Sequence, residues 1–216
     1  MALATDLRPA IMMIPVLEHK GLEVLAFTLD AEPEIIRAVG AALSQDECRR
    51  TNELKSERDR RRFTLARGQL RRVLASRLGI PPSEIELEYG RQGKPSLSRR
   101  MPDHTLQFNL SRSEDIAVIA LSTDGAVGID VEAIRPVPEA DDIAALCFSA
   151  SEHQSYCKLR PEERLEGFFR GWTRLEAISK ALGFGLGGGL AADERDLTIS
   201  AFVPEPGYVG TVVVRN

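Results

Sequence analysis

The sequence contains few of the residues that build disulfide-bonded or metal-centred folds. Its 216 residues include three cysteines and three histidines, and aromatic residues make up 6%. Three cysteines do not make a disulfide framework, which suits a reducing compartment, so we expect a cytoplasmic protein. Cys147, His153 and Cys157 lie near one another, but no C-x-x-C pair and no fourth ligand accompany them, which argues against structural zinc.

Long apolar runs are missing as well. The apolar run at residues 11–17 is too short to span a membrane and contains Pro15, and no charged-then-apolar leader precedes it. We therefore expect neither a membrane span nor a secretory signal. Residues 183–189 include five glycines, but they do not form G-x-G-x-x-G after a strand, so a dinucleotide-binding fold is not expected.

The bulk composition is that of an ordinary soluble globular protein, with 43% hydrophobic and 28% charged residues and a net charge of −4. The longest helical pattern, at residues 57–78, carries eight arginines against Glu57 and Asp59. Most of these arginines are explained by a solvated face, with one or two free to meet phosphate. Overall acidity, few aromatics and the lack of a recognisable module argue against nucleic-acid binding.

Periodicity and turn residues predict a chain of both helices and strands whose first domain closes near Ser122, which divides it into residues 1–122 and 123–216. Helices are expected at residues 32–43, after the capping box of Ser44 and Glu47, at 57–78, after Ser149, and at 161–180. Strands are expected at residues 22–29, 85–89, 116–121, 127–132, 197–203 and 208–214. Residues 108–113 form a polar segment between two apolar runs. A turn at Asp124 and Gly125 predicts that strands 116–121 and 127–132 form a hairpin.

The run Val127-Gly128-Ile129-Asp130-Val131-Glu132 carries two carboxylates at alternate positions. Alternate residues of a strand face the same side, so Asp130 and Glu132 are expected side by side while Val131 faces the core. Neighbouring like charges repel unless a cation lies between them, and a divalent metal is the obvious candidate. An edge strand with one solvated face explains the residue types equally well.

The helix that ends near residue 180 carries Trp172, Glu176 and Lys180 on nearly one face. An ordinary surface Glu–Lys pair would account for the last two. The large tryptophan on the same stripe argues that this face is at least partly buried.

Four segments occur in an order that is similar to a known family: Gly93-Lys94-Pro95, Asn109-Leu110-Ser111, Gly128 to Glu132, and Trp172-Thr173-Arg174 with Glu176-Ala177 and Lys180. Together they resemble 4′-phosphopantetheinyl transferases of the surfactin-synthetase-activating type. The resemblance implies two similar α+β halves, with coenzyme A and Mg²⁺ in the cleft between them. It also implies transfer of the phosphopantetheine arm to a serine of an acyl or peptidyl carrier protein, release of 3′,5′-ADP, and a monomer.

The resemblance also assigns roles to single residues. Asp130, Glu132 and Glu176 match metal-binding acids, Lys180 matches the lysine near the pyrophosphate, and Glu176 is the preferred base for the serine hydroxyl. Arg62 and Lys94 match contacts to coenzyme A phosphates, and Pro95 and Ser111 lie in segments that line coenzyme A.

Two positions depart from the family pattern. Arg112 stands where the family has histidine, and we expect it to bind the 3′-phosphate because arginine is always charged. Leu175 replaces a lysine and leans away from the stripe of Trp172, Glu176 and Lys180. A catalytically weak coenzyme A-binding regulatory protein remains the alternative, although retention of all three acids and Lys180 favours the enzyme.

Overall fold

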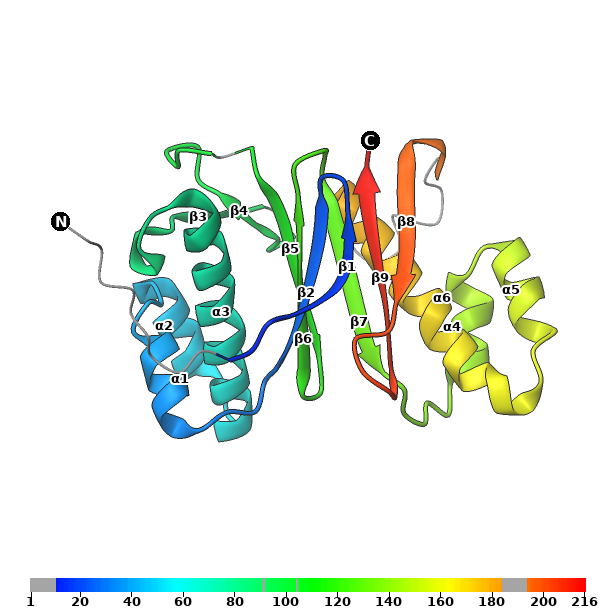
Figure 1. The fold of residues 1–216 in the computed structure, drawn as a ribbon. Helices are drawn as coiled ribbons and strands as arrows, with labels where there is room; N and C mark the ends of the chain where they lie inside the picture. Colours follow the sequence, from blue (N-terminus) through cyan, green and yellow to red (C-terminus); the bar gives the residue numbers. More distant parts are fainter. Residues whose placement is uncertain (1–10, 91, 104, 184–193) are drawn as a thin grey trace.

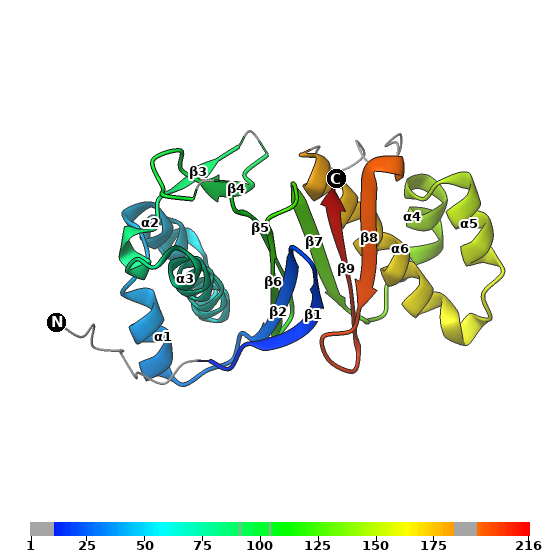
Figure 2. The same cartoon turned by 45° about the horizontal axis from the view of Figure 1, so that its top comes forward.

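The chain folds into four layers, in which two β-sheets pack face to face and helices cover both outer sides (Figures 1 and 2). This computed structural model describes residues 11–90, 92–103, 105–183 and 194–216. The predicted α+β class in two halves is confirmed. Strands of the first sheet all precede Thr123 and strands of the second all follow it. Whether residues 1–122 and 123–216 are separate domains stays a prediction.

The first half consists of an antiparallel sheet and its helices. The sheet has the order β1-β2-β6-β5, with β1 Ile14–His19, β2 Leu22–Thr28, β6 Ile116–Ser122 and β5 Gln107–Ser113. The helices are α1 Pro33–Gly40, α2 Gln45–Glu53 and α3 Glu57–Leu78. A 3₁₀ turn at Pro82–Glu84 leads to the small hairpin of β3 Leu87–Tyr89 and β4 Pro95–Leu97.

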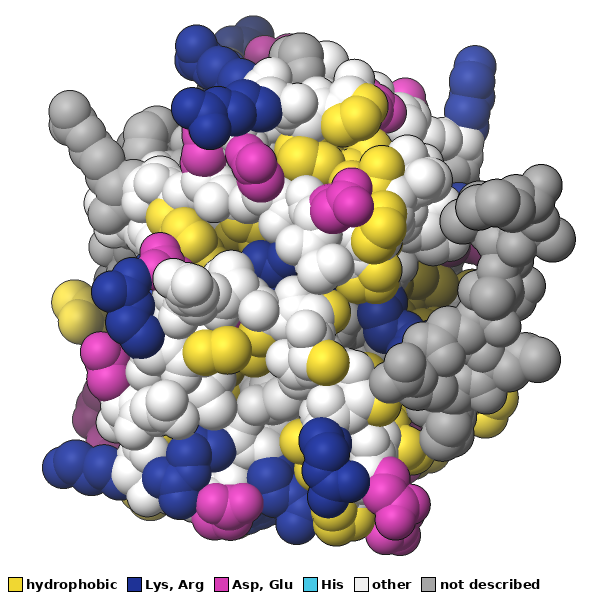
Figure 3. Space-filling view, turned by 90° about the vertical axis from the view of Figure 1, so that its left-hand side faces the viewer, with side chains coloured by type: hydrophobic (Ala, Val, Ile, Leu, Met, Phe, Trp, Pro, Cys, Tyr) yellow, Lys and Arg dark blue, Asp and Glu magenta, His cyan; other side chains and the backbone are white. Residues whose placement is uncertain are grey.

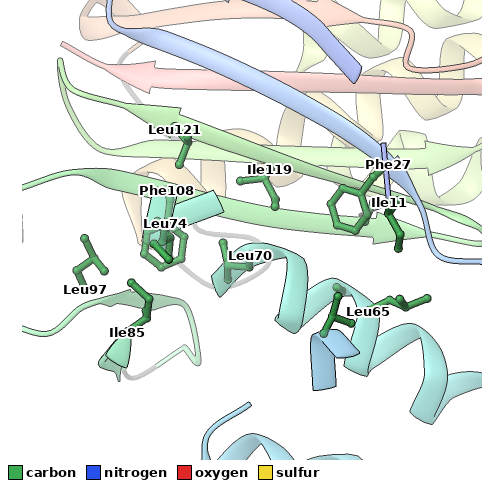
Figure 4. Packing of buried hydrophobic residues seen from close by; sticks show 14 of the residues in the cluster. Ile11, Phe27, Leu65, Leu70, Leu74, Ile85, Leu97, Phe108, Ile119 and Leu121 are labelled. Carbon is green, nitrogen blue, oxygen red and sulfur yellow. The ribbon is translucent and has the colours of Figure 1, made fainter. Parts of the chain in front are cut away.

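Helix α3 supplies the core of the first half. Leu65, Leu70 and Leu74 are fully buried and face Phe27, Phe108 and Ile119 of the sheet (Figure 4). The bounds of α3 agree with the prediction because Ser56 caps its start and Gly79, at φ +69°, ends it in the left-handed region. One face of the sheet is therefore sealed by α3, and only its other face and its edges remain for the second half.

Helix α2 is held by a buried ion pair. Ser44 and Glu47 form the predicted capping box, and Glu47 also accepts a 2.6 Å bond from Nε of Arg71 on α3. Arg71 Nη1 donates to the carbonyls of Pro82 and Ile85. These contacts explain how one arginine of the basic helix is buried, which residue type alone did not indicate.

The second half has a three-stranded antiparallel sheet of order β7-β9-β8, with β7 Val127–Ala133, β9 Tyr208–Arg215 and β8 Leu197–Phe202. Its helices are α4 Ala140–Cys147, α5 Ala150–Cys157 and α6 Pro161–Leu182, with a 3₁₀ turn at Glu194–Asp196 before β8. Val24 and Val118 of the first sheet pack against Ile129 and Val131 of β7 in the interior between the sheets.

The predicted hairpin of residues 116–121 and 127–132 is wrong. Strand β6 is flanked by β2 and β5 on its two edges, so it has no edge left for β7, which pairs with β9 instead. The turn at Asp124 and Gly125 carries the chain from one sheet to the other, and Gly125 fits there because a Cβ would lie 1.9 Å from Arg215 O.

Candidate functional site

The two acids of β7 lie where β7 of the second sheet meets β5 of the first sheet, a contact called the seam below. Asp130 is only 5% exposed, and its Oδ1 accepts bonds from Ser111 Oγ of β5 at 2.8 Å and from Lys180 Nζ of α6 at 2.6 Å. Glu132 accepts from Ser113 Oγ at 2.6 Å and from Arg135 Nη1 at 3.0 Å. The interpretation of this strand as an edge with a solvated face is therefore wrong for Asp130.

Strand β5 meets β7 through alternate polar side chains. Asn109 Oδ1 accepts the backbone N–H of Ile129 at 2.8 Å, and Ser111 and Ser113 follow at two-residue intervals with their bonds to the acids. Ser113 Oγ also accepts the N–H of Ala133. Polar side chains that face a neighbouring strand explain why residues 108–113 looked like a polar connection in the sequence although they form a strand.

The backbone of helix α6 lies close against that of β7 at Gly128. A Cβ on Gly128 would lie 2.1 Å from Ala177 O and 2.4 Å from Ala181 N, so only glycine fits at this position. This contact places Lys180 over Asp130, where its Nζ also reaches Ile129 O at 3.2 Å. The glycine two residues before Asp130 thus sets the distance between the acid and the lysine.

Asp130 has the electrostatics of a cation ligand. Burial raises the pKa of its carboxyl to about 6, although Lys180 and Ser111 partly offset this effect. Its Oδ2 is buried and has no hydrogen-bond partner among the described atoms. A buried carboxylate oxygen without a partner is costly, and a bound cation would relieve that cost. The chemistry of Asp130 Oδ2 therefore fits a cation ligand.

Glu176 lies on α6, one turn before Lys180, and is half-buried. It makes no hydrogen bond or ion pair within the described part of the chain. Over those same residues, no group of three His, Cys, Asp or Glu side chains is close enough to hold a metal. Joint ligation by Asp130, Glu132 and Glu176 thus stays a prediction. Trp172, on the same stripe, stacks on Phe168 and is half-buried, as expected.

A group of three arginines, called the arginine group below, lies on the first half near β5: Arg62, Arg67 and Arg112. Arg112 is exposed and, within the described ranges, makes no hydrogen bond or ion pair. Partial burial lowers the pKa of its guanidinium, with Asp59 opposing this effect and Arg67 and Arg62 adding to it. Such a concentration of positive charge favours an anion.

Arg62 and Arg67 differ in whether their guanidinium groups have hydrogen-bond partners. Arg62 is almost buried and pairs with Asp115, whose pKa the Arg62 hydrogen bond lowers. Arg67 Nη1 is buried without a hydrogen-bond partner in the described structure, and its guanidinium lies 5.6 Å from the Phe63 ring centroid. Sequence reasoning did not single out Arg67, because nothing in the basic helix distinguishes an unpaired guanidinium from a solvated one.

Lys94 and Pro95 lie at the end of the β3–β4 loop. They line a cavity of about 360 Å³ together with Gly90, Phe108 and Gly183, the last of which follows α6. Lys94 Nζ donates to Val127 O and Lys180 O, both at 2.8 Å. Two of its donors are therefore used inside the protein, and its contact with phosphate stays a prediction.

Other candidate sites gain little from the structure. Cys157 Sγ lies 3.5 Å from His153 Nε2, but no metal-binding group is found in the described ranges.

On the face shown in Figure 3, basic side chains are interspersed with acidic and apolar ones. None of the described helices is both long and apolar enough to cross a membrane. A cavity of about 720 Å³ between α5 and α6 contains none of the predicted site residues.

The site thus combines a buried acid with one carboxylate oxygen that has no partner among the described atoms, a lysine bonded to its other oxygen, and a group of arginines, and this combination suits a phosphorylated ligand bound with a cation. Residues 126–203 match the model of the 4′-phosphopantetheinyl transferase superfamily, and residues 30–124 match that of the 4′-phosphopantetheinyl transferase N-terminal region.

Relatives that match most of the chain agree with the family models. The chain is 37% identical over 183 residues to the 4′-phosphopantetheinyl transferase HetI of Nostoc sp., covering 85% of this chain and 75% of HetI. It is 34% identical over 178 residues to a putative 4′-phosphopantetheinyl transferase of Synechocystis sp., covering 80% and 71%. It is 30% identical over 165 residues to the human L-aminoadipate-semialdehyde dehydrogenase-phosphopantetheinyl transferase, covering 73% and 53%. The chain belongs to the 4′-phosphopantetheinyl transferase superfamily and is an enzyme of that class.

Proposed function

We propose that the enzyme transfers the 4′-phosphopantetheine arm of coenzyme A to a serine of an acyl or peptidyl carrier protein, with Mg²⁺, and releases 3′,5′-ADP. The observation that carries this proposal is the seam at Asp130. A buried carboxylate oxygen without a partner lies there beside Lys180, which is what a metal–pyrophosphate complex requires.

Asp130 would hold Mg²⁺ through Oδ2, with Glu132 and Glu176 as the further carboxylates. Mg²⁺ is bound by a few carboxylates together with phosphate oxygens and water, and when bound it neutralises charge on the pyrophosphate. Glu132 accepts hydrogen bonds from Ser113 and Arg135, and Glu176 has no partner among the described residues. Rotation of these two side chains toward Asp130 is therefore the change that we expect on binding.

The arginine group would bind the phosphates of coenzyme A. Arg112 and Arg67 each have unused donors, and their mutual repulsion falls when an anion lies between them. Arg112 takes the position of the histidine that the family uses for the 3′-phosphate, and it keeps its charge at every physiological pH. Arg62 lies beside them and would exchange part of its contact with Asp115 for phosphate.

In the transfer, the serine oxygen of the carrier forms a bond to the β-phosphorus, and the bond from that phosphorus to the bridging oxygen breaks. The electron pair leaves with 3′,5′-ADP. Glu176 takes the proton of the serine hydroxyl, directly or through water, because it is a carboxylate without a competing partner in the described structure. Lys180 lies beside Asp130 and stabilises the charge that develops on the leaving phosphate.

The surfactin-synthetase-activating type is supported by the arrangement of the seam. Both halves belong to one chain, and β5 and α6 complete the surroundings of Asp130 without a second copy. We therefore propose a monomer that encloses its own site.

Incubation with coenzyme A, Mg²⁺ and several apo carrier proteins tests the proposal. Intact-mass spectrometry should show the addition of one phosphopantetheine to a carrier, and chromatography should show an equal amount of 3′,5′-ADP. If no carrier gains mass while a reference transferase modifies the same samples, the alternative of a coenzyme A-binding regulatory protein replaces the proposal.

A further inference from the structure

The C-terminal turn of α6 receives a cation from the opposite half of the molecule. Lys94 belongs to the loop between β3 and β4, and its Nζ donates to Lys180 O of α6 and Val127 O of β7, each at 2.8 Å. The loop holds the lysine in place, because the N–H of Gly90 donates to Lys94 O and Gly93 adopts φ +76°.

Both acceptors lack a partner in their own element. Helix α6 ends at Leu182, and the capping N–H of Gly183 bonds to Ser179 O, so Lys180 O is one of the terminal carbonyls without a donor in the helix. The last turn of a helix also carries partial negative charge, which favours a cation. In β7, Ala126 O accepts Arg215 N–H, so the next carbonyl, that of Val127, points away from β9.

The bond from Lys94 holds the backbone of Lys180, whose side chain belongs to the proposed site. Lys180 accepts a bond from Lys94 at its carbonyl and donates with its ammonium to Asp130. Gly128, which follows the acceptor Val127, brings the β7 backbone against Ala177 and Ala181 of α6, next to the other acceptor, Lys180. Loss of the Lys94 bonds would free the last turn of α6 at the point where it sets the position of the Lys180 side chain.

We propose that Lys94 is a positioning residue that caps α6 from the first half and thereby holds Lys180 on Asp130. Its kinetic consequence rests on the proposed function, but its structural consequence does not. Burial and the neighbouring Lys180 lower the pKa of Lys94 to about 8. This agrees with an amine enclosed by protein, and even the neutral amine keeps two N–H donors for the two carbonyls.

Hydrogen exchange tests the cap without reference to catalysis. In Lys94→Met, we expect backbone amides 181–183 to exchange about tenfold faster than in the wild type, because the last turn opens more often. Lys94→Arg retains donors and should stay within about threefold of the wild type. Lys158→Met, which removes an exposed lysine outside the seam, is the matched control and should leave these amides unchanged. If the Met variant does not fold, Lys94→Gln takes its place with the same expectation.

Kinetics with coenzyme A then separates positioning from phosphate binding. A positioning role predicts that Lys94→Met lowers kcat about tenfold or more while KM for coenzyme A changes less than about threefold. Unchanged amide exchange together with a large rise in KM would overturn the proposal and make Lys94 a phosphate ligand. If the wild type itself transfers nothing, the proposed function fails, and amide exchange alone still decides whether Lys94 caps the helix.

Discussion

Lys180 Nζ lies 2.6 Å from Asp130 Oδ1, although 50 residues separate them in the chain. The lysine comes from the last turn of α6 and the acid from the middle of β7. The pair thus stands at the meeting point of a helix and a strand that are fixed by Gly128. In the proposed reaction, Oδ2 of Asp130 would hold the cation and Lys180 would stabilise negative charge on the pyrophosphate.

Replacement of Glu176 by glutamine should remove the base and one metal ligand. We expect the rate of carrier modification to fall about a hundredfold or more, and the Mg²⁺ concentration for half-maximal rate to rise. Glu166→Gln on the same helix is the matched control, because among the described residues Glu166 pairs with Arg170 at the surface. An equal rate for both variants in a Mg²⁺ titration would contradict the role of Glu176.

Arg112 should act through its charge. We expect Arg112→Ala to raise KM for coenzyme A about tenfold, because it removes a charge-assisted bond to phosphate, whereas Arg112→His should keep most of the activity. Arg72→Ala, on the basic helix but outside the arginine group, controls for overall charge. Steady-state kinetics at varied coenzyme A concentration decides this, and no change in Arg112→Ala would exclude a phosphate contact.

Gly128 should tolerate no side chain. A methyl group would meet the backbone of Ala177 and Ala181, which cannot move aside without shifting α6, so we expect Gly128→Ala to lower the free energy of unfolding by about 3 kcal/mol or more. In the control Gly40→Ala, the contact found for the added methyl within the described structure is the flexible Thr64 side chain at 3.1 Å, and stability should change little. Urea unfolding measures both. A fully stable Gly128→Ala protein would show that the helix–strand contact is looser than described.

Lys94 should make stability depend on pH. Its pKa is about 8 in the folded protein and 10.5 for an ordinary lysine, so between these values the unfolded chain binds more protons. The free energy of unfolding of the wild type should therefore rise relative to Lys94→Met as the pH increases from 8 to 10.5. Urea unfolding of both proteins at pH 7.5 and 9.5 measures this difference. A constant or falling difference would mean that the Lys94 ammonium is not desolvated.

The sequence predicted those elements whose signals are local. Helix α3 agrees at both ends because Ser56 and Gly79 mark them, and the Ser44–Glu47 capping box forms as expected. Strand β5 was missed because Asn109, Ser111 and Ser113 are polar. They face β7 in the folded protein, and the sequence does not show that this neighbour is there. The hairpin prediction failed for the same reason, since a local turn does not reveal that both edges of β6 are occupied.

The site could be predicted in part. The ordered motifs singled out both Asp130 and Lys180, and the structure brings the two side chains into contact, whereas the roles assigned to them stay predictions. The buried, unpartnered Nη1 of Arg67 and the carbonyl bonds of Lys94 depend on what surrounds each charge in the folded described structure, and residue type alone does not predict those surroundings.

The most direct test measures the intact mass of one apo carrier protein after incubation with coenzyme A and either the wild type or Asp130→Asn. With Mg²⁺, the wild type should add one phosphopantetheine per carrier; with a chelator it should add none, and excess Mg²⁺ should restore the reaction. Asp130→Asn should be slower by about a hundredfold or more at an unchanged circular-dichroism spectrum. Equal rates for the two proteins, or full modification in the presence of the chelator, would contradict a metal-dependent reaction at Asp130.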